Sequence, residues 1–162
     1  MRVLAGLVSA MILLLPAAPA LAQPAPIASK TGELNLSARK SFERYSSGKK
    51  ARSKGTLTAL NVTTDTIPPV ATVKVSGKTY DYTKNATCGY SVFRVTYMKA
   101  DGSLPFKHRT FRNCGYNTGK SFTFTDKRVY LVELKVCSEA KHTNPSINCL
   151  YAGAWKILYS TQ

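Results

Sequence analysis

Acidic residues and histidines are scarce in this sequence. It contains 8 Asp and Glu against 23 Lys and Arg, and 2 His in 162 residues. The motifs of serine hydrolases, P-loop nucleotide-binding proteins, zinc proteases and calcium-binding loops are all missing from it. These absences remove the common enzyme classes that a short motif identifies, and they favour a non-enzymatic protein.

Long hydrophobic runs are also absent, except at the N-terminus. Met1 and Arg2 precede an apolar run over residues 3–15, and the segment ends on the A-x-A pattern of residues 20–22. This is the arrangement of a secretory signal peptide, so we expect residues 1–22 to be removed on export. The run is shorter than the about 20 apolar residues of a membrane span. The sequence therefore predicts a secreted, extracellular protein, or a periplasmic one in a Gram-negative bacterium, with no transmembrane segment.

Positive charge dominates what remains after the signal peptide. The leader contains one basic and no acidic residue, so its removal lowers the formal net charge from +15 to +14. Such a charge attracts polyanions such as nucleic acid, acidic lipid headgroups and anionic wall polymers. The alternative is that the charge serves only to keep an exported protein in solution.

Cysteine is present in an even number. The four residues are Cys88, Cys114, Cys137 and Cys149. No C-x-x-C pair occurs, so neither a zinc site nor a cofactor is expected, and an even count in a small exported domain indicates disulfides. A hairpin centred on Asp101 places Cys88 opposite Cys114, at a separation that suits a disulfide. The remaining pair, Cys137 with Cys149, closes a loop of 11 residues.

Two regions of different composition follow the signal peptide. Residues 23–54 are rich in Lys, Arg and Ser and poor in branched apolar residues, so we predict a flexible basic arm there. In residues 55–162, β-branched and aromatic residues dominate and turn signals recur every 8 to 14 residues. We therefore predict an all-β fold: one antiparallel β-sandwich of immunoglobulin-like size with two disulfides. The candidate strands are 56–63, 70–76, 79–83, 90–99, 106–112, 121–125, 129–137 and 150–159.

Basic residues are interleaved with aromatic ones in several of these segments. Single-stranded nucleic-acid sites combine a cationic groove with aromatic stacking platforms. Most aromatic residues of a sandwich belong to its core, so the basic residues are the better candidates for contact with a polyanion. The candidate binding residues are Lys49, Lys50, Arg52, Lys54, Lys107, Arg109, Arg112, Lys127 and Arg128.

The leading hypothesis is a secreted, non-enzymatic protein that attaches to a cell-envelope polymer or to extracellular nucleic acid. The arm would supply long-range, salt-sensitive attraction, and a basic, aromatic face of the sandwich would supply closer contact.

Two alternatives remain open. A secreted ribonuclease-like toxin would use His108 and His142 as acid and base, with Arg109 or Lys141 on the phosphate. A protein-binding or inhibitor module would present the disulfide-closed loop 138–148, because a pre-organised loop loses less entropy on binding.

Overall fold

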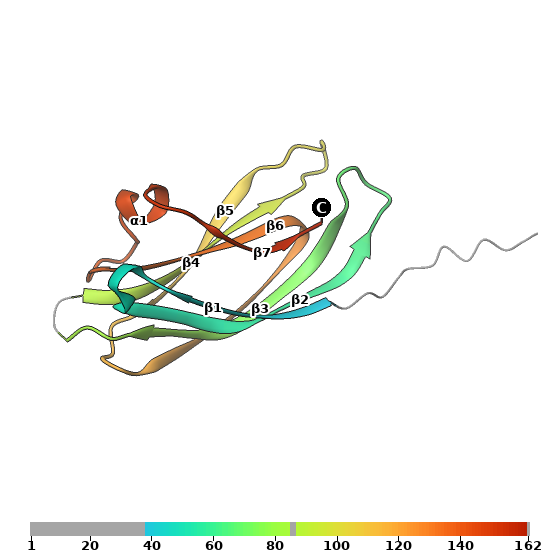
Figure 1. Ribbon diagram of the computed structural model, residues 1–162. Helices are drawn as coiled ribbons and strands as arrows, with labels where there is room; N and C mark the ends of the chain where they lie inside the picture. The colour runs from blue at the N-terminus through green and yellow to red at the C-terminus, as the bar shows by residue number, and fades with distance from the viewer. Residues whose placement is uncertain (1–37, 85–86, 162) are drawn as a thin grey trace, which may run out of the picture. The chain divides into compact units, whose positions relative to one another are not determined.

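The computed structural model describes residues 38–84 and 87–161, and their regular structure is almost entirely antiparallel strand (Figure 1). The elements are β1 (Ala38–Tyr45), the 3-10 turn η1 (Ser47–Lys49), β2 (Ala51–Thr63), β3 (Val70–Asp81), β4 (Thr87–Tyr97), β5 (Phe106–Asn113), β6 (Gly119–Ala140), α1 (Ile147–Tyr151) and β7 (Lys156–Ser160). No helix in this part of the chain is long and apolar enough to cross a membrane.

The strands form a sandwich because one long strand belongs to both layers. The sheet order is β1-β2-β3-β6-β4-β5, and β7 pairs with β6 outside this path. β3 pairs with residues 119–129 of β6, whereas β4 pairs with residues 129–140. The first half of β6 therefore belongs to the layer β1-β2-β3 and its second half to the layer with β4 and β5, and the two layers face each other (Figure 1). The prediction of an antiparallel β-sandwich is confirmed.

Phenylalanine rings fill the space between the two layers. Phe93 of β4 is fully buried, and its ring lies edge-on to that of Phe42 on β1, with 5.9 Å between the ring centroids. Phe122 and Phe124 of β6 approach the same ring to 5.4 and 5.1 Å. Aromatic contacts of this kind add about 0.5–1.5 kcal/mol each to the stabilisation that burial gives. Phe93 is therefore a central contact between the two layers within a larger apolar core.

A pair of glycines lies at the centre of the layer β1-β2-β3. Gly55 of β2 is directly opposite Gly77 of β3. A Cβ atom at Gly77 would come within 2.4 Å of the Lys54 carbonyl oxygen and 2.9 Å of the Phe122 ring, so no side chain fits there. The break predicted at this glycine was wrong for that reason: the strands expected at 70–76 and 79–83 are one strand, β3.

β6 also joins two predicted strands, 121–125 and 129–137. Arg128 between them has a positive φ of 54°, and the pairing registers with β3 and β4 both shift beside it. Its guanidinium donates hydrogen bonds to the carbonyl oxygens of Met98 and Lys99, at 2.9 and 3.1 Å. The irregularity at Arg128 is therefore built into one continuous strand.

The last predicted strand, 150–159, was wrong over its first half. Residues Ile147–Tyr151 form the helix α1, and the strand β7 begins only at Lys156. Ser146 caps the helix, because its side-chain oxygen accepts a hydrogen bond from the Cys149 backbone nitrogen at 3.1 Å.

Both predicted disulfides are present. They join Cys88 to Cys114, with 4.2 Å between the Cα atoms, and Cys137 to Cys149, with 5.9 Å between them. Gly89 pairs with Asn113 in the β4–β5 ladder, which is the register of a hairpin centred on Asp101. The pairing predicted from that register is confirmed.

Residues 38–54, the described part of the predicted basic arm, form strands. Phe42 is 5% exposed and Ala51 and Ser53 are fully buried, so alternate residues of this segment pack against the core. The segment 38–54 contains few branched apolar residues because the residues on the outward face of its strands are polar. The prediction of a flexible arm was therefore wrong for residues 38–54. The rest of that prediction, residues 23–37, and the signal peptide at 1–22 lie outside the described residues.

Two side chains tie β1 to the C-terminal segment. Nη2 of Arg44 donates to the carbonyl oxygen of Ala154 at 2.7 Å, and Nζ of Lys156 donates to the carbonyl oxygen of Glu43 at 2.9 Å. Among the described strands, β1 pairs only with β2. These two contacts therefore attach its other edge to residues that come more than a hundred positions later in the chain.

Candidate functional site

The outer face of the layer β1-β2-β3 gathers positive charge. Ala51, Ser53 and Leu57 of β2 are buried, so the residues between them point outward, and the same alternation holds on β1 and β3. We call this surface the cationic face. Its charged and aromatic residues are Arg39, Glu43, Tyr45, Arg52, Lys54, Lys74, Lys78, Tyr80 and Tyr82. Two of the predicted binding residues, Arg52 and Lys54, lie on it.

Two lysines of the cationic face lie directly opposite each other. Lys54 of β2 pairs with Lys78 of β3, and Glu43 of β1 is the neighbour of Lys54 on the other side. Glu43 forms its ion pair with Arg52, at 3.4 Å. Among the described residues, no carboxylate pairs with Lys54 or Lys78. Like charges in direct cross-strand positions destabilise a sheet. The Lys54–Lys78 pair is therefore an unfavourable and unbalanced positive charge at the centre of this face.

Tyrosine rings border this charge. The guanidinium of Arg52 lies 4.5 Å from the centroid of the Tyr80 ring and 5.8 Å from that of Tyr45. Nζ of Lys54 is 5.5 Å from the same Tyr80 ring, which stacks on Tyr82 at 6.2 Å. A hydrogen bond to Tyr45 is the main cause that raises the pKa of Arg52, and burial raises the pKa of Tyr82. The tyrosines therefore hold Arg52 in place while Tyr45 stays exposed.

Sequence reasoning missed most of this surface. It grouped basic residues that are close in the chain, whereas a strand brings every second residue to the same face. Tyr80 and Tyr82 share a face by their spacing, and the same period extends to Lys78, Ser76 and Lys74. This two-residue period was the sequence signal that could have predicted the cationic face.

Lys107 and Arg109, two further candidates, share one buried carboxylate. Asp126 of β6 is 5% exposed; Nζ of Lys107 lies 2.6 Å from its carboxylate, and Arg109 donates to both of its oxygens, at 2.8 and 3.2 Å. Burial works to raise the pKa of Asp126, but the hydrogen bonds from Arg109 and Lys107 outweigh it and hold that pKa below its usual value. This group fastens β5 to β6.

The other candidates fall into two kinds. Arg112 donates to the carbonyl oxygen of His142, and Arg128 donates to two carbonyls, so both guanidinium groups hold loops in place. Lys49, Lys50 and Lys127 are exposed, and no carboxylate of the described residues pairs with them. These three lysines therefore have no carboxylate partner within the described chain.

The two histidines occupy different places. His108 of β5 stacks on Trp155 with 5.8 Å between the rings, and burial, followed by the charge of Arg94, lowers its pKa. His142 follows β6, and its backbone nitrogen and carbonyl are both bonded to the Tyr90 hydroxyl. Arg112, which holds the His142 carbonyl, lies four residues beyond His108 on β5, a distance of about 13 Å along a strand. The structure therefore does not bring the proposed acid and base together, and Lys141 is exposed in the same loop as His142.

The loop that the inhibitor hypothesis used is shorter than predicted. Residues 138–140 belong to β6, and α1 begins at residue 147. The carboxylate of Glu139 accepts two hydrogen bonds from Ser146, at 2.9 Å from the backbone nitrogen and 2.6 Å from the hydroxyl. Ile147 and Tyr151 on α1 are exposed.

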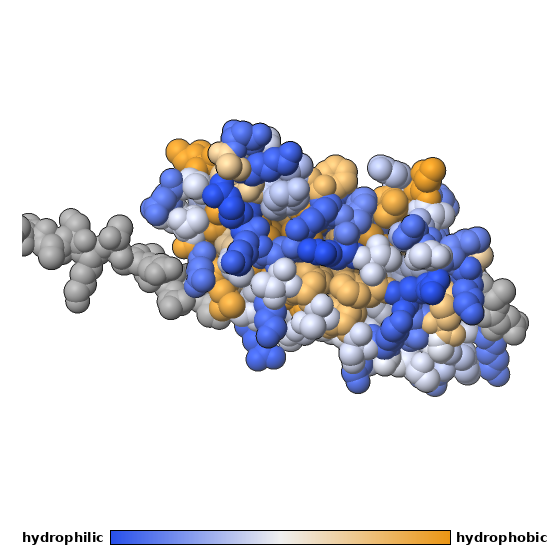
Figure 2. Space-filling view, turned by 180° about the vertical axis from the view of Figure 1, so that it is seen from behind, coloured by the Kyte–Doolittle hydropathy of each residue, from blue (hydrophilic) through white to orange (hydrophobic). Residues whose placement is uncertain are grey.

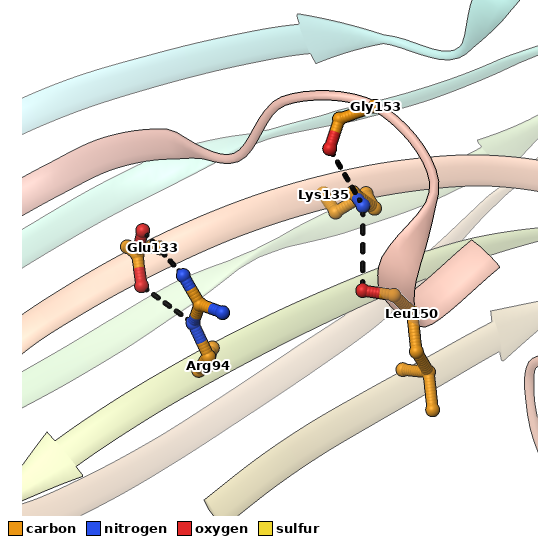
Figure 3. A network of polar contacts seen from close by, with 5 residues as sticks. All are labelled: Arg94, Glu133, Lys135, Leu150 and Gly153. Atoms are coloured by element: carbon orange, nitrogen blue, oxygen red, sulfur yellow. Dashed lines mark hydrogen bonds and ion pairs between the residues drawn. The ribbon is translucent and has the colours of Figure 1, made fainter. Parts of the chain in front are cut away.

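A buried polar network on the other layer was not predicted (Figure 3). Arg94 of β4 binds both carboxylate oxygens of Glu133 on β6, at 2.6 and 2.9 Å. Lys135 points to the turn after α1, where its Nζ donates to the carbonyl oxygens of Leu150, Ala152 and Gly153, at 3.4, 2.7 and 3.2 Å. The Trp155 ring lies 4.6 Å from Arg94 and 4.8 Å from Lys135. Opposite charges two residues apart, Glu133 and Lys135, within the otherwise apolar stretch 129–137 were the sequence signal for this network.

Figure 2 shows one face of the molecule, on which strongly hydrophilic side chains lie between small apolar areas. No group of three or more potential metal ligands lies together among the described residues. Comparison of the chain with protein-family models, with curated proteins and with solved structures gives no match. The cationic face is therefore the feature of the described chain that bears on function.

Proposed function

We propose that the protein is an exported, non-enzymatic binder of a polyanionic polymer, either a cell-envelope polymer or extracellular nucleic acid, and that the cationic face is its contact surface. The observation that carries this proposal is the Lys54–Lys78 pair, which lies at the centre of the face and pairs with no carboxylate among the described residues. A bound polyanion would relieve the repulsion between these two side chains, because it supplies the missing negative charge between the strands.

Three cations of the other layer support this choice of surface. Lys107 and Arg109 share Asp126, and Arg94 is bonded to Glu133. Carboxylates therefore balance the charge of these three side chains inside the fold, whereas Lys54 and Lys78 pair with no carboxylate among the described residues.

Binding would proceed by two contributions with different ranges. The net charge attracts a polyanion over about one Debye length, which is close to 10 Å at 0.1 M salt. At contact, the lysines neutralise individual anionic groups and release counterions. Exposed Tyr45 offers a ring against which a base or a sugar can stack.

Export is part of this proposal. The signal peptide expected at residues 1–22 lies outside the described residues, and the two disulfides are compatible with an oxidising compartment.

The test compares two double variants of the chain from residue 23 onward. Lys54→Met with Lys78→Met removes the central pair, whereas Lys99→Met with Lys120→Met removes the same charge from exposed lysines elsewhere. Fluorescence anisotropy of labelled single-stranded RNA and of labelled polyphosphate, measured over a series of salt concentrations, gives the affinity and its salt slope.

We expect the first double variant to reduce the slope of log affinity against log salt by about 1.4 for RNA, since each phosphate contact on a single strand contributes about 0.7. The second double variant should change it little. Equal losses in both variants would mean that net charge alone drives binding and that the cationic face is not the site. No binding of either polymer at about 50 mM salt, where exposed charges are weakly screened, would refute polyanion binding altogether.

A further inference from the structure

A cleft of about 480 Å³ lies next to the turn between β1 and β2. Its walls come from the end of β1 and the η1 turn, from the last part of β6, and from the segment around α1. Its charged lining residues are Arg44, Lys50, Lys135 and Glu139. The volume is within the range of about 300–1,000 Å³ that small-molecule sites have.

Positive charge in this cleft exceeds negative charge. Among the described residues, Glu139 is the one carboxylate of the cleft lining, and Ser146 already donates two hydrogen bonds to it, at 2.9 and 2.6 Å. Lys50 pairs with no carboxylate among the described residues. Arg44 uses one nitrogen for the Ala154 carbonyl oxygen, which leaves its other N–H groups without a partner in the described chain.

Lys135 is the unusual member of the set, because it is 4% exposed and no described carboxylate balances its charge. Three backbone carbonyls satisfy its hydrogen bonds, as Figure 3 shows for two of them, but they leave a full positive charge beneath the cleft. Burial, followed by the charge of Arg44, lowers the pKa of Lys135. The two cations are therefore close enough to repel each other.

We infer that this cleft binds a phosphate monoester carried on a small polar unit such as a sugar. Its lining has three cations and one carboxylate, an excess of two positive charges, and a phosphate monoester carries about −1.5 to −2 at pH 7. Arg44 and Lys50 donate to the phosphate oxygens, while buried Lys135 contributes a field that solvent screens poorly. The hydroxyl-rich turn at Ser46 and Ser47 lines the remaining space for a polar ligand body.

This site is distinct from the proposed contact surface. The cationic face is centred on Lys54 and Lys78, neither of which lines the cleft, and Tyr45 is the residue that the two have in common. Binding of a phosphate monoester in the cleft therefore does not require binding of a long polymer.

The test is isothermal titration calorimetry of the chain from residue 23 onward with glucose 6-phosphate, with glucose as the uncharged control. We expect glucose 6-phosphate to bind at one site per chain and glucose to give no binding heat. Affinity should fall on going from pH 7 to pH 5, because the monoester loses its second charge near pH 6. Absence of binding by glucose 6-phosphate at millimolar concentration would overturn the inference, as would equal binding of glucose.

Two single variants locate the binding. Lys50→Met should weaken glucose 6-phosphate binding by on the order of tenfold, the usual effect of losing a hydrogen bond to a charged group. Lys99→Met makes the same charge change in the turn between β4 and β5, away from the cleft, and should leave the affinity within twofold. Equal weakening in the two variants would show that the anion binds by net charge and would overturn the site. Failure of the polymer proposal would show instead as unchanged RNA binding in the Lys54 and Lys78 double variant.

Discussion

The Arg94–Glu133 pair offers a sharp test of how the β4-β6 layer is stabilised. Glu133→Gln keeps the shape of the side chain but removes its charge, so the Arg94 guanidinium loses the carboxylate that accepts hydrogen bonds at 2.6 and 2.9 Å. The Glu133 side chain is 9% exposed and that of Arg94 is 32% exposed, so solvent screens only part of the loss.

The expected magnitude lies between two limits. Breaking a fully buried pair costs about 3–5 kcal/mol, whereas an exposed pair contributes about 0–1 kcal/mol. With one partner buried and the other one-third exposed, we expect Glu133→Gln to lower the free energy of unfolding by about 2 kcal/mol. For a domain of this size, that loss corresponds to a fall in Tm of about 4–8 °C.

The assay is guanidinium denaturation followed by fluorescence of Trp155, the single tryptophan, which contacts Arg94 at 4.6 Å. A companion variant, Arg94→Met with Glu133→Met, removes both charges and should be close to the unaltered protein in stability, since no unpaired charge is left. A loss below about 0.5 kcal/mol for Glu133→Gln would mean that water solvates the pair, and it would refute the reasoning from burial.

Two further predictions test the new assignments of β1 and Asp126. Phe42→Ala should lower the free energy of unfolding by about 3–5 kcal/mol in thermal melts followed by circular dichroism, because the ring packs on Phe93; an unchanged Tm would show that β1 is not part of the core. The folded-state pKa of Asp126 lies below its unfolded value of about 3.9, so its stabilisation is present above that pH and is lost as the pH falls through the folded-state pKa. The difference in Tm between the unaltered protein and Asp126→Asn should therefore be largest near pH 6 and shrink toward pH 2, and a constant difference would contradict the ion-pair assignment.

Alternation of side chains made most strands predictable, and it also explains the hairpin of β4 and β5. Positions that sum to 202 pair across it, so Cys88 and Cys114 could be matched from the sequence. The register is strongly specified there, because a shift by one residue would exchange the two faces of β4. Buried Val92 and Val95, which point to opposite faces, would then each leave the apolar cluster that they pack in.

Composition was a poorer guide than alternation at the N-terminal end. The basic and polar average of residues 38–54 predicts an arm, although Phe42 and Ala51 fill core positions. An average over a segment mixes its two faces, and a strand with one solvated face then resembles a disordered chain. For the same reason, segment averages did not predict the cationic face, because its residues are neighbours across paired strands and are distant in sequence.

Gly77 shows a second reason why strand boundaries could not be predicted from the sequence. A glycine between two apolar runs usually marks a turn, and only its long-range partners, Gly55 and the Phe122 ring, show why the strand continues. Those partners are set by the pairing of three strands, which local sequence does not contain. The places of the two histidines depend likewise on long-range contacts, since His108 of β5 stacks on Trp155 and His142 is bonded to the Tyr90 hydroxyl.

The reciprocal contacts between β1 and the C-terminal segment have a consequence for how the chain is assembled. A polypeptide is made from its N-terminus, so β1 and β2 are complete long before Ala154 and Lys156 exist. An edge strand presents backbone groups that another strand can pair with, and until then neither contact to the outer edge of β1 is present. These contacts therefore form only when nearly all of the chain has been made, and a copy that stops before residue 154 would lack both of them.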